Sequence, residues 1–305
     1  MPERDLIAIF GGIDAEFRRD EPMSAHTTLG IGGPAELYIE PGNAEALAEV
    51  MKRASLHNVP VMPLGGGSNV LVSDAGIEGV VVAMRFNDYM SVISRDQHVA
   101  VVHAGAGVPL QRLINFLADE GLTGLEGLSG IPGLLGGAIA GNAGSFGAEI
   151  KDAIANVALL GRDGGVRQAG LDEIRFEYRR ALIPEDSIVL SAMLRLRTDA
   201  PAAIRERMAG FLARKKLTQP VGERSAGCVF KNPEAASAGQ MIDTLGFKGE
   251  RVGDIEVSAL HANFFVNRGN GTAADFRRLM ALVGERVLEA TGVALEPEIR
   301  MVGRW

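Results

Sequence analysis

The chain has 305 residues, 47% of them hydrophobic and 23% charged, a composition typical of a soluble globular protein with two or three domains. A net charge of -7 argues against a nucleic-acid partner, because phosphate-binding surfaces need clustered Lys and Arg. Cys228 is the only cysteine, which excludes an intrachain disulfide and fits a cytoplasmic protein. No stretch approaches the roughly 18 apolar residues that a membrane helix needs, so we expect no membrane insertion.

The first part of the chain predicts mixed α and β structure. The apolar run from Leu6 to Ile13 follows two acidic residues and precedes no A-x-A cleavage pattern, so it does not indicate a signal peptide. Periodicity predicts helices over 43–58 and 109–120. Short β-rich runs predict strands over 59–64, 79–84, 91–94 and 99–102.

The second part continues in the same way. Asp163-Gly164 between two β-rich runs predicts a hairpin of 157–160 with 166–168. A helix over 202–217 ends at Gln219-Pro220 and predicts a bridge to a new domain. Beyond it, the pattern predicts helices over 238–245 and 272–290, and strands over 262–266 and 295–302; a strand over 188–196 precedes the bridge. We therefore expect an α+β protein.

The segment from Gly121 to Gly147 is the most unusual part of the sequence, because it holds ten of the 39 glycines in 27 residues. Its first six glycines recur every third residue, but so few triplets with only Pro132 cannot form a collagen helix. Glycine is used where only a Cα hydrogen fits. We expect a loop whose backbone lines a ligand.

A second glycine turn lies in PLGGGSNVLV, from Pro63 to Val72. Its exposed N–H groups, with Ser68 and Asn69, would suit a pyrophosphate. It is neither a Walker A loop nor a Rossmann fingerprint, since no Lys follows and the spacing differs. Together the two turns favour a dinucleotide such as a flavin dinucleotide, although two unrelated structural turns remain the alternative.

Three further segments carry candidate chemical groups. In SAGCVFKNP, from Ser225, Cys228 could be an inert buried residue or a proton donor, since a thiol with an ordinary pKa of about 8.5 is protonated at neutral pH. FEYRR from Phe176 and LEPEIR from Leu295 read from composition alone as surface or structural charges. The five histidines lack metal-ligand spacing, and no metal site is implied.

These segments, in this order, resemble the UDP-N-acetylenolpyruvoylglucosamine reductase family. The resemblance rests on seven ordered blocks: TTLGIGGPAEL, PLGGGSNVLVSDAGIEGVVV, GLEGLSGIPGLLGGAIAGNAGSFGAEI, FEYRRALI, SAGCVFKNP, LHANFFVN and LEPEIR. The absence of a long insertion between Arg180 and Ser225 resembles the shorter subtype. The resemblance implies bound FAD, NADPH as hydride donor, and reduction of UDP-N-acetylglucosamine enolpyruvate in peptidoglycan precursor synthesis.

The resemblance also implies a fold. It is an FAD-binding region of the vanillyl-alcohol-oxidase (PCMH) type in two subdomains, followed by a smaller α+β substrate domain. The expected bounds are 1–86 and 87–199 for the two FAD-binding subdomains, with the C-terminal strand 295–305 packed near the second, and 200–305 for the substrate domain. We expect a monomer or weak oligomer.

Site residues carry over from the family's motifs. Arg179 would stabilise the enolate formed by hydride addition, Glu298 would assist, and Cys228 would protonate the carbon. Residues expected to bind the cofactor are Gly65, Gly66, Gly67, Ser68 and Asn69 at the pyrophosphate, and Ile131, Gly133, Gly137, Ala138 and Gly144 at the flavin. Residues expected near the substrate are Lys231, Asn232 and His261.

Two positions depart from the commoner family pattern. Cys228 stands where Ser is usual, and a thiol donor would begin to be lost above roughly pH 8.5. Phe146 stands where many members carry Tyr, so a hydroxyl contact is missing there. The alternatives to the reductase are a different flavin oxidase on the same scaffold and a non-catalytic module that binds nucleotide sugars.

Overall fold

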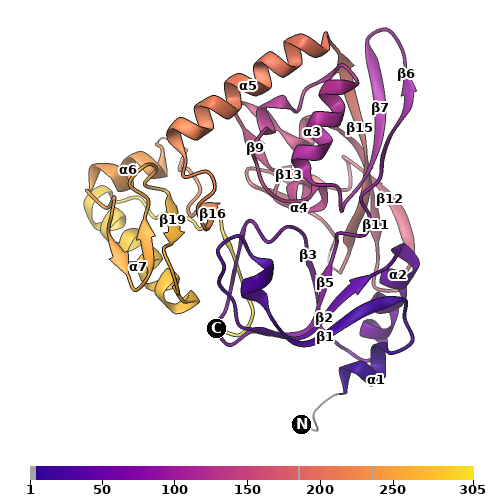
Figure 1. Cartoon of the computed structure of the whole chain (residues 1–305), viewed down its shortest axis with the longest axis horizontal. Helices are drawn as coiled ribbons and strands as arrows, with labels where there is room; N and C mark the ends of the chain where they lie inside the picture. The colour runs from indigo at the N-terminus through magenta and orange to yellow at the C-terminus, as the bar shows by residue number, and fades with distance from the viewer. Residues whose placement is uncertain (1–4, 185, 235) are drawn as a thin grey trace. The chain divides into compact units, whose positions relative to one another are not determined.

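The computed structural model describes residues 5–184, 186–234 and 236–305, which form two compact units. Unit 1 contains the described residues of Met1–Arg19, Leu37–Gly66 and Gly79–Ala213, and unit 2 contains those of Asp20–Glu36, Gly67–Glu78 and Arg214–Trp305. Each unit is assembled from separate stretches of chain (Figure 1). The division into three domains at residues 86 and 199 stays a prediction.

The described elements confirm the α+β class expected from the sequence. The helices are α1 Leu6–Phe10, α2 Ala44–Leu56, α3 Leu110–Asp119, α4 Leu135–Ala140, α5 Pro201–Thr218, α6 Ala238–Thr244 and α7 Ala273–Thr291. The strands are β1 Ala15–Pro22, β2 Pro34–Pro41, β3 Val61–Leu64, β4 Val70–Val72, β5 Ile77–Ala83, β6 Met90–Arg95, β7 Val99–Gly105, β8 Leu122–Thr123, β9 Gly144–Ser145, β10 Ala148–Glu149, β11 Ile154–Leu160, β12 Val166–Gly170, β13 Arg175–Glu177, β14 Arg180–Leu182, β15 Ile188–Thr198, β16 Ser225–Cys228, β17 Arg251–Val252, β18 Ile255–Val257, β19 Phe264–Asn267 and β20 Arg300–Val302.

The first sheet, mostly in unit 1, has the strand order β1-β2-β5-β3, and β3 runs parallel to β5. Helix α2 begins at Asn43, whose side chain accepts a hydrogen bond from the N–H of Ala46 at 2.7 Å. Its apolar stripe, Leu47, Val50 and Met51 among others, is buried in a core shared with this sheet. Strand β3 ends at Leu64, and the glycine turn begins at the next residue.

The second sheet of unit 1 has the order β12-β11-β15-β7-β6, with β8 added to β15, and its pairings are antiparallel. The predicted hairpin of β11 and β12 is confirmed. Leu110, Leu113 and Leu117 of α3 pack into the core of this sheet, and α4 contributes Leu135 and Ile139. Helix α4 lies within the glycine block, so that part of the block is helix rather than loop.

Unit 2 has a sheet of order β16-β19-β18-β17, and α6 and α7 pack on it (Figure 1). Helix α7 begins with a capping box of Thr272 and Asp275 and ends at Gly292, which has a left-handed φ of 72°. Phe265, Phe276 and other fully buried side chains fill the core between α7 and the sheet. Strand β20 pairs with β4 in parallel.

Two differences from the sequence pattern have simple causes. The strand predicted over 295–302 is limited to β20, because Pro297 interrupts it and residues 296–299 instead bond to the chain near Val229. Strand β1, AEFRRDEP, was not predicted because it lies at a sheet edge, with no fully buried side chain and no apolar alternation. Among the described helices, none has the length and apolar character needed to cross a membrane.

Candidate active site

The two predicted glycine segments meet within unit 1. A Cβ atom added to Gly66 would lie 2.8 Å from the Cα of Gly133, closer than side-chain atoms approach backbone. A Cβ added to Gly65 would lie 3.7 Å from the Cβ of Leu134. The structure therefore brings the end of β3 and the start of the α4 region together backbone to backbone, which explains glycine at both positions.

Gly67 begins the part of the first glycine turn that belongs to unit 2. Its φ is +62°, and a Cβ there would lie 1.9 Å from the carbonyl oxygen of His26. Its carbonyl accepts a hydrogen bond from the N–H of Thr28 at 3.0 Å. Only glycine fits this position, and the turn that follows through Ser68 and Asn69 is fixed by this contact.

One glycine of helix α4, Gly137, faces open space. Gly137 is exposed, and a Cβ added there would meet no atom within 4 Å. Gly136 differs, because its Cβ would lie 2.9 Å from the Cβ of Ala106. Ala138 is buried and Ile131 packs against the core of unit 1. Packing inside unit 1 thus explains glycine at position 136, whereas Gly137 leaves room for a bound molecule at the surface of the unit.

Asn142 is a buried polar residue of the glycine block that pattern reading did not single out. It is fully buried, with a left-handed φ of 41°, and its Nδ2 donates to Glu149 Oε2 at 3.1 Å and to the carbonyl of Glu177 at 3.0 Å. Its Oδ1 is buried with no hydrogen-bond partner among the described residues. The sequence signal for this residue was an asparagine within a glycine-rich turn, because Asn adopts left-handed backbone more readily than other residues that carry a side chain.

Arg179 lies in the two-residue turn between β13 and β14, with a φ of +58° that side-chain-bearing residues rarely adopt. Its Nη1 donates to the carbonyl oxygen of Gly144 at 2.6 Å, and its guanidinium lies 5.5 Å from the ring centre of Tyr178. A Cβ on Gly144 would lie 3.0 Å from that Nη1, so glycine admits the guanidinium. Strained backbone of this kind is typical of functional sites.

Glu149 supplies negative charge beside Arg179. Burial raises the pKa of Glu149, but hydrogen bonds from Lys151 and Asn142 and the charges of Lys151 and Arg179 outweigh it, so the pKa is lowered overall. The carboxylate therefore stays ionised at neutral pH. The guanidinium, the glycine block and this carboxylate form one polar cluster in unit 1.

Phe146, the second departure from the family pattern, has an aromatic partner on α5. Its ring stacks on that of Phe211, with centroids 4.8 Å apart and planes 19° from parallel. Its φ of +51° places it in a tight turn between β9 and β10. The stacking holds the ring by apolar contact, which needs no hydroxyl.

Cys228 and the segment that carries Glu298 lie together in unit 2. Cys228 ends β16 and pairs with Phe264 of β19. The next residue, Val229, accepts a hydrogen bond from the N–H of Glu298 at 2.8 Å and donates to the carbonyl of Asn263, also at 2.8 Å. Cys228 and Glu298 are both half-buried. The backbone segments that contain them are hydrogen-bonded to each other through Val229.

The residues expected near the substrate have different surroundings, although all belong to unit 2. Lys231 Nζ is 2.5 Å from Glu296 Oε1, and its backbone N–H donates to the Glu296 carbonyl at 2.8 Å. Asn232 is exposed, and its Oδ1 accepts from the N–H of Ala238 at the start of α6. In the structure, Lys231 is therefore ion-paired, and Asn232 bonds to the first residue of α6.

His261 is held neutral by its position. Its Nδ1 accepts a hydrogen bond from the N–H of Asn263 at 3.2 Å, and its ring meets Phe264 edge-on at 4.8 Å. Burial lowers the pKa of His261. The unfolded chain therefore binds a proton at a higher pH than the folded chain, so stability falls as pH falls through about 6.5, the ordinary value.

We expect this histidine to make the protein less stable in mild acid. Between pH 7.5 and 5.5 the wild type should lose more stability than His261→Asn, by at most about 1.4 kcal/mol for each pH unit. Thermal melting of both proteins across this range measures the difference. Parallel loss in the two proteins would contradict the assignment, because the remaining titrating groups are common to both.

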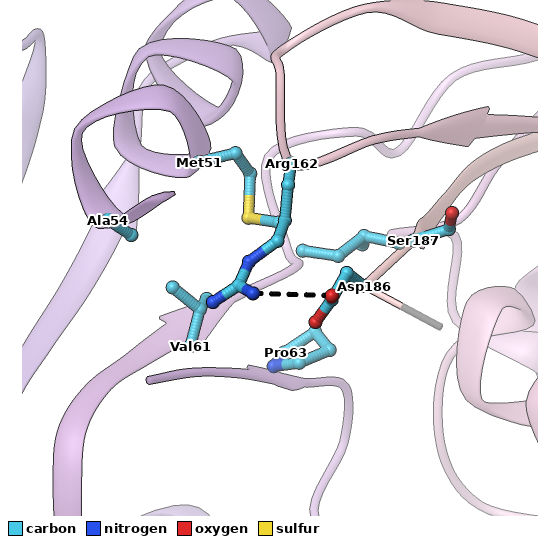
Figure 2. A pocket seen from close by; sticks show the side chains of 8 residues that line it. Met51, Ala54, Val61, Pro63, Arg162, Asp186 and Ser187 are labelled. Atoms are coloured by element: carbon cyan, nitrogen blue, oxygen red, sulfur yellow. Dashed lines mark hydrogen bonds and ion pairs between the residues drawn. The ribbon is translucent and has the colours of Figure 1, made fainter. Parts of the chain in front are cut away.

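A cavity of about 200 Å³ in unit 1 lies away from the predicted residues (Figure 2). Met51 and Ala54 of α2, with Val61 and Pro63 of β3, form one side, and an ion pair of Arg162 with Asp186 at 3.3 Å lies across it. None of the predicted site residues lines it. Among the described residues, no cluster of three or more His, Cys, Asp or Glu side chains could hold a metal ion.

Comparison with known proteins decides the family. Residues 35–170 match the FAD binding domain model, and residues 219–302 match the C-terminal domain model of UDP-N-acetylenolpyruvoylglucosamine reductase. The reductase of that name from Geobacter metallireducens is 41% identical over 288 residues, covering 94% of each chain. The chain belongs to the UDP-N-acetylenolpyruvoylglucosamine reductase family.

Solved structures agree with this assignment. The reductase of this family from Thermus caldophilus has a TM-score of 0.80 and 36% identity, covering 94% of this chain and 98% of its own. A variant of Physcomitrella patens BBE-like 1, with a TM-score of 0.51 and 20% identity over 64% of this chain and 45% of its own, shares the fold alone. The FAD-binding fold expected from the sequence, and the shorter subtype of the reductase family, are confirmed.

The residues of unit 1 fit the cofactor of this reductase family. The backbones of Gly66 and Gly133 approach too closely for any side chain between them, and Gly137 faces open space on α4. Asn142 adds a buried acceptor, Oδ1, with no hydrogen-bond partner in the described chain. Of these features, the open space over Gly137 is the one that leaves room for a long, flat cofactor against the backbone.

Proposed function

We propose that this protein is an FAD-dependent reductase that converts UDP-N-acetylglucosamine enolpyruvate to UDP-N-acetylmuramate with NADPH. The observation that carries this conclusion is the reductase relative that is 41% identical over 288 residues and covers 94% of the chain. Peptidoglycan precursor synthesis is the pathway. Such a protein acts in the cytoplasm, and we propose a monomer or weak oligomer.

The cofactor is assigned to the two glycine segments. Gly65, Gly66, Gly67, Ser68 and Asn69 hold the pyrophosphate, and the flavin side is held by Ile131, Gly133, Gly137, Ala138 and Gly144. FAD, once reduced by NADPH, supplies the hydride that is added to C3 of the enolpyruvyl group. The protein's part is to hold that group against the substrate and to manage charge and protons.

Three side chains manage the charge and the proton. Addition of hydride to C3 leaves negative charge on C2 and the substrate carboxylate, which Arg179 stabilises as a fixed cation. Its bond to the Gly144 carbonyl orients the guanidinium before the substrate binds. Cys228 then gives its proton to C2, and Glu298, on the neighbouring segment, assists.

The substrate's polar groups are assigned to unit 2. Lys231, Asn232 and His261 belong to the same unit as Cys228, and we propose that they contact the nucleotide sugar. Lys231 must exchange Glu296 for a substrate phosphate, because its Nζ is paired in the structure. We also propose the three-domain division at residues 86 and 199.

The function is tested by following NADPH oxidation with purified protein. We expect oxidation that depends on UDP-N-acetylglucosamine enolpyruvate and yields UDP-N-acetylmuramate in equal amount. Rapid reoxidation by oxygen with an alcohol, and no response to the enolpyruvyl nucleotide, would instead favour a flavin oxidase. A colourless protein that binds the nucleotide sugar without turnover would favour a binding module.

Gly137 gives a separate test of the cofactor site. Gly137→Ala should leave the fold intact or raise its stability by about 0.5–1 kcal/mol, because its Cβ meets no protein atom and alanine favours helix. The same methyl group should weaken FAD binding, since it fills the space assigned to the flavin. Melting temperature and titration of apoprotein with FAD measure the two effects.

Gly210→Ala is the matched control, because a Cβ at that position of α5 also meets nothing within 4 Å. It should change stability in the same direction and leave FAD affinity unchanged. Equal FAD affinity in Gly137→Ala and the wild type would place the flavin elsewhere.

A further inference from the structure

Asn69 ends the first glycine turn and bonds to the backbone on both sides of Ile299. Its Nδ2 donates to the carbonyl oxygen of Glu298 at 3.3 Å, and its own carbonyl accepts from the N–H of Arg300 at 3.1 Å. These residues are all in unit 2. One residue of the predicted pyrophosphate turn therefore holds the segment that carries Glu298.

The opposite side of the same segment is held by the strand that carries Cys228. The N–H of Glu298 donates to the carbonyl of Val229, so both backbone polar groups of Glu298 have a partner. Asn263, only 2% exposed, holds Phe230, the residue after Val229, by two hydrogen bonds. Its Oδ1 accepts from the N–H of Phe230 at 2.9 Å, and its Nδ2 donates to the Phe230 carbonyl at 2.7 Å. The position of Glu298 is thus set by two anchored neighbours.

The turn itself is anchored beyond Asn69. Strand β4 follows directly and pairs with β20, with Val70 opposite Arg300. Two residues beyond β4, Asp74 accepts hydrogen bonds from the N–H groups of Ala273 and Ala274 at 2.8 and 2.9 Å, at the start of α7. A shift of the turn would therefore move the backbone of Glu298, and Asn69 is the side chain that transmits it.

We propose that Asn69 is a positioning residue for the reaction, which fixes the backbone of Glu298 relative to the turn that holds the cofactor. This inference rests on the proposed function. Its side-chain amide donates to the backbone carbonyl of Glu298, so the side chain aligns the segment that carries the carboxylate, while the backbone of Asn69 remains part of the turn assigned to the pyrophosphate. Misplacement of a catalytic group by about 1 Å can cost about 100-fold in rate, which sets the scale of the expected effect.

The test compares Asn69→Ala with Ser68→Ala in the FAD-loaded enzyme, because both residues belong to the same turn. In Asn69→Ala, NADPH should reduce the flavin within about two-fold of the wild-type rate, while reoxidation by the enolpyruvyl substrate slows about 10- to 100-fold. The loss should fall on kcat more than on KM. In Ser68→Ala, the ratio of the two half-reaction rates should stay at the wild-type value.

Two outcomes would overturn the inference. One is equal loss in both half-reactions of Asn69→Ala, which a merely structural role would produce. The other is weaker FAD binding than in Ser68→Ala with normal reoxidation of the loaded enzyme, which would indicate a phosphate ligand. Should Asn69→Ala fail to fold, Asn69→Asp keeps the shape and Oδ1 but lacks the donor, and should show the same selective loss.

Turnover of the enolpyruvyl nucleotide by the wild-type protein distinguishes failure of this inference from failure of the proposed function. Without turnover of the enolpyruvyl nucleotide by the wild type, the proposed function fails and the inference falls with it. With wild-type turnover and an unaltered rate ratio in Asn69→Ala, only the inference fails.

Discussion

Replacement of Cys228 by alanine should reduce the rate of flavin reoxidation by the enolpyruvyl substrate by about 10²- to 10⁴-fold, the usual contribution of a general acid. Reduction of the flavin by NADPH should be nearly unchanged, because it needs no proton from this side chain. Stopped-flow absorbance separates the two half-reactions. Full turnover in Cys228→Ala would show that the proton comes from another group.

Cys228→Ser is the matched variant, because it replaces the thiol by a hydroxyl at nearly the same size. We expect it to retain much of the activity. A thiol ionises at a lower pH than a serine hydroxyl, so the wild type should lose reoxidation rate in alkaline solution at a pH where Cys228→Ser does not. An identical alkaline profile in the two proteins would contradict a thiol donor.

Replacement of Arg179 by glycine should separate stability from activity. Glycine adopts the left-handed φ of +58° without strain, so the variant should fold at least as stably as the wild type. Loss of the guanidinium should lower the rate of reoxidation by the substrate about 10²- to 10³-fold, the scale found when one stabilising donor is removed. Thermal melting and half-reaction kinetics provide the two measurements.

Arg179→Lys serves as the control for charge. It keeps a cation but not the planar fork that both bonds Gly144 and reaches a carboxylate, so we expect partial activity between those of Arg179→Gly and the wild type. Wild-type reoxidation in Arg179→Gly would remove Arg179 from the mechanism. Loss of folding in Arg179→Gly would contradict the strained-backbone account instead.

Local pattern and family resemblance predicted the elements that contain the site. The glycine segments and the helices α2, α3 and α7 follow from glycine placement and apolar periodicity, whereas the strand that ends at Cys228 was not predicted. The edge strand β1 and the hairpin that presents Arg179 lack such periodicity. Within the glycine block, the helix α4 was hidden because glycine is a poor helix former and tertiary packing decides its conformation.

The contacts that align the site could not be predicted in this way. Asn69 and Glu298 are 229 residues apart, and the bond between them depends on β4 pairing with β20. Asn142 likewise joins the glycine block to Glu177, 35 residues further along the chain. Such partners are set by the fold, and a single sequence without covarying relatives carries no signal for them.

The central claim is that this chain holds FAD and passes hydride from NADPH to the enolpyruvyl nucleotide. The most direct test is the visible absorbance spectrum of the purified protein, recorded alone, after anaerobic NADPH, and after addition of UDP-N-acetylglucosamine enolpyruvate. We predict a flavin spectrum that NADPH bleaches without the nucleotide and that the nucleotide then restores. A protein with no flavin band, or a bleached flavin that the nucleotide leaves bleached, would contradict the account.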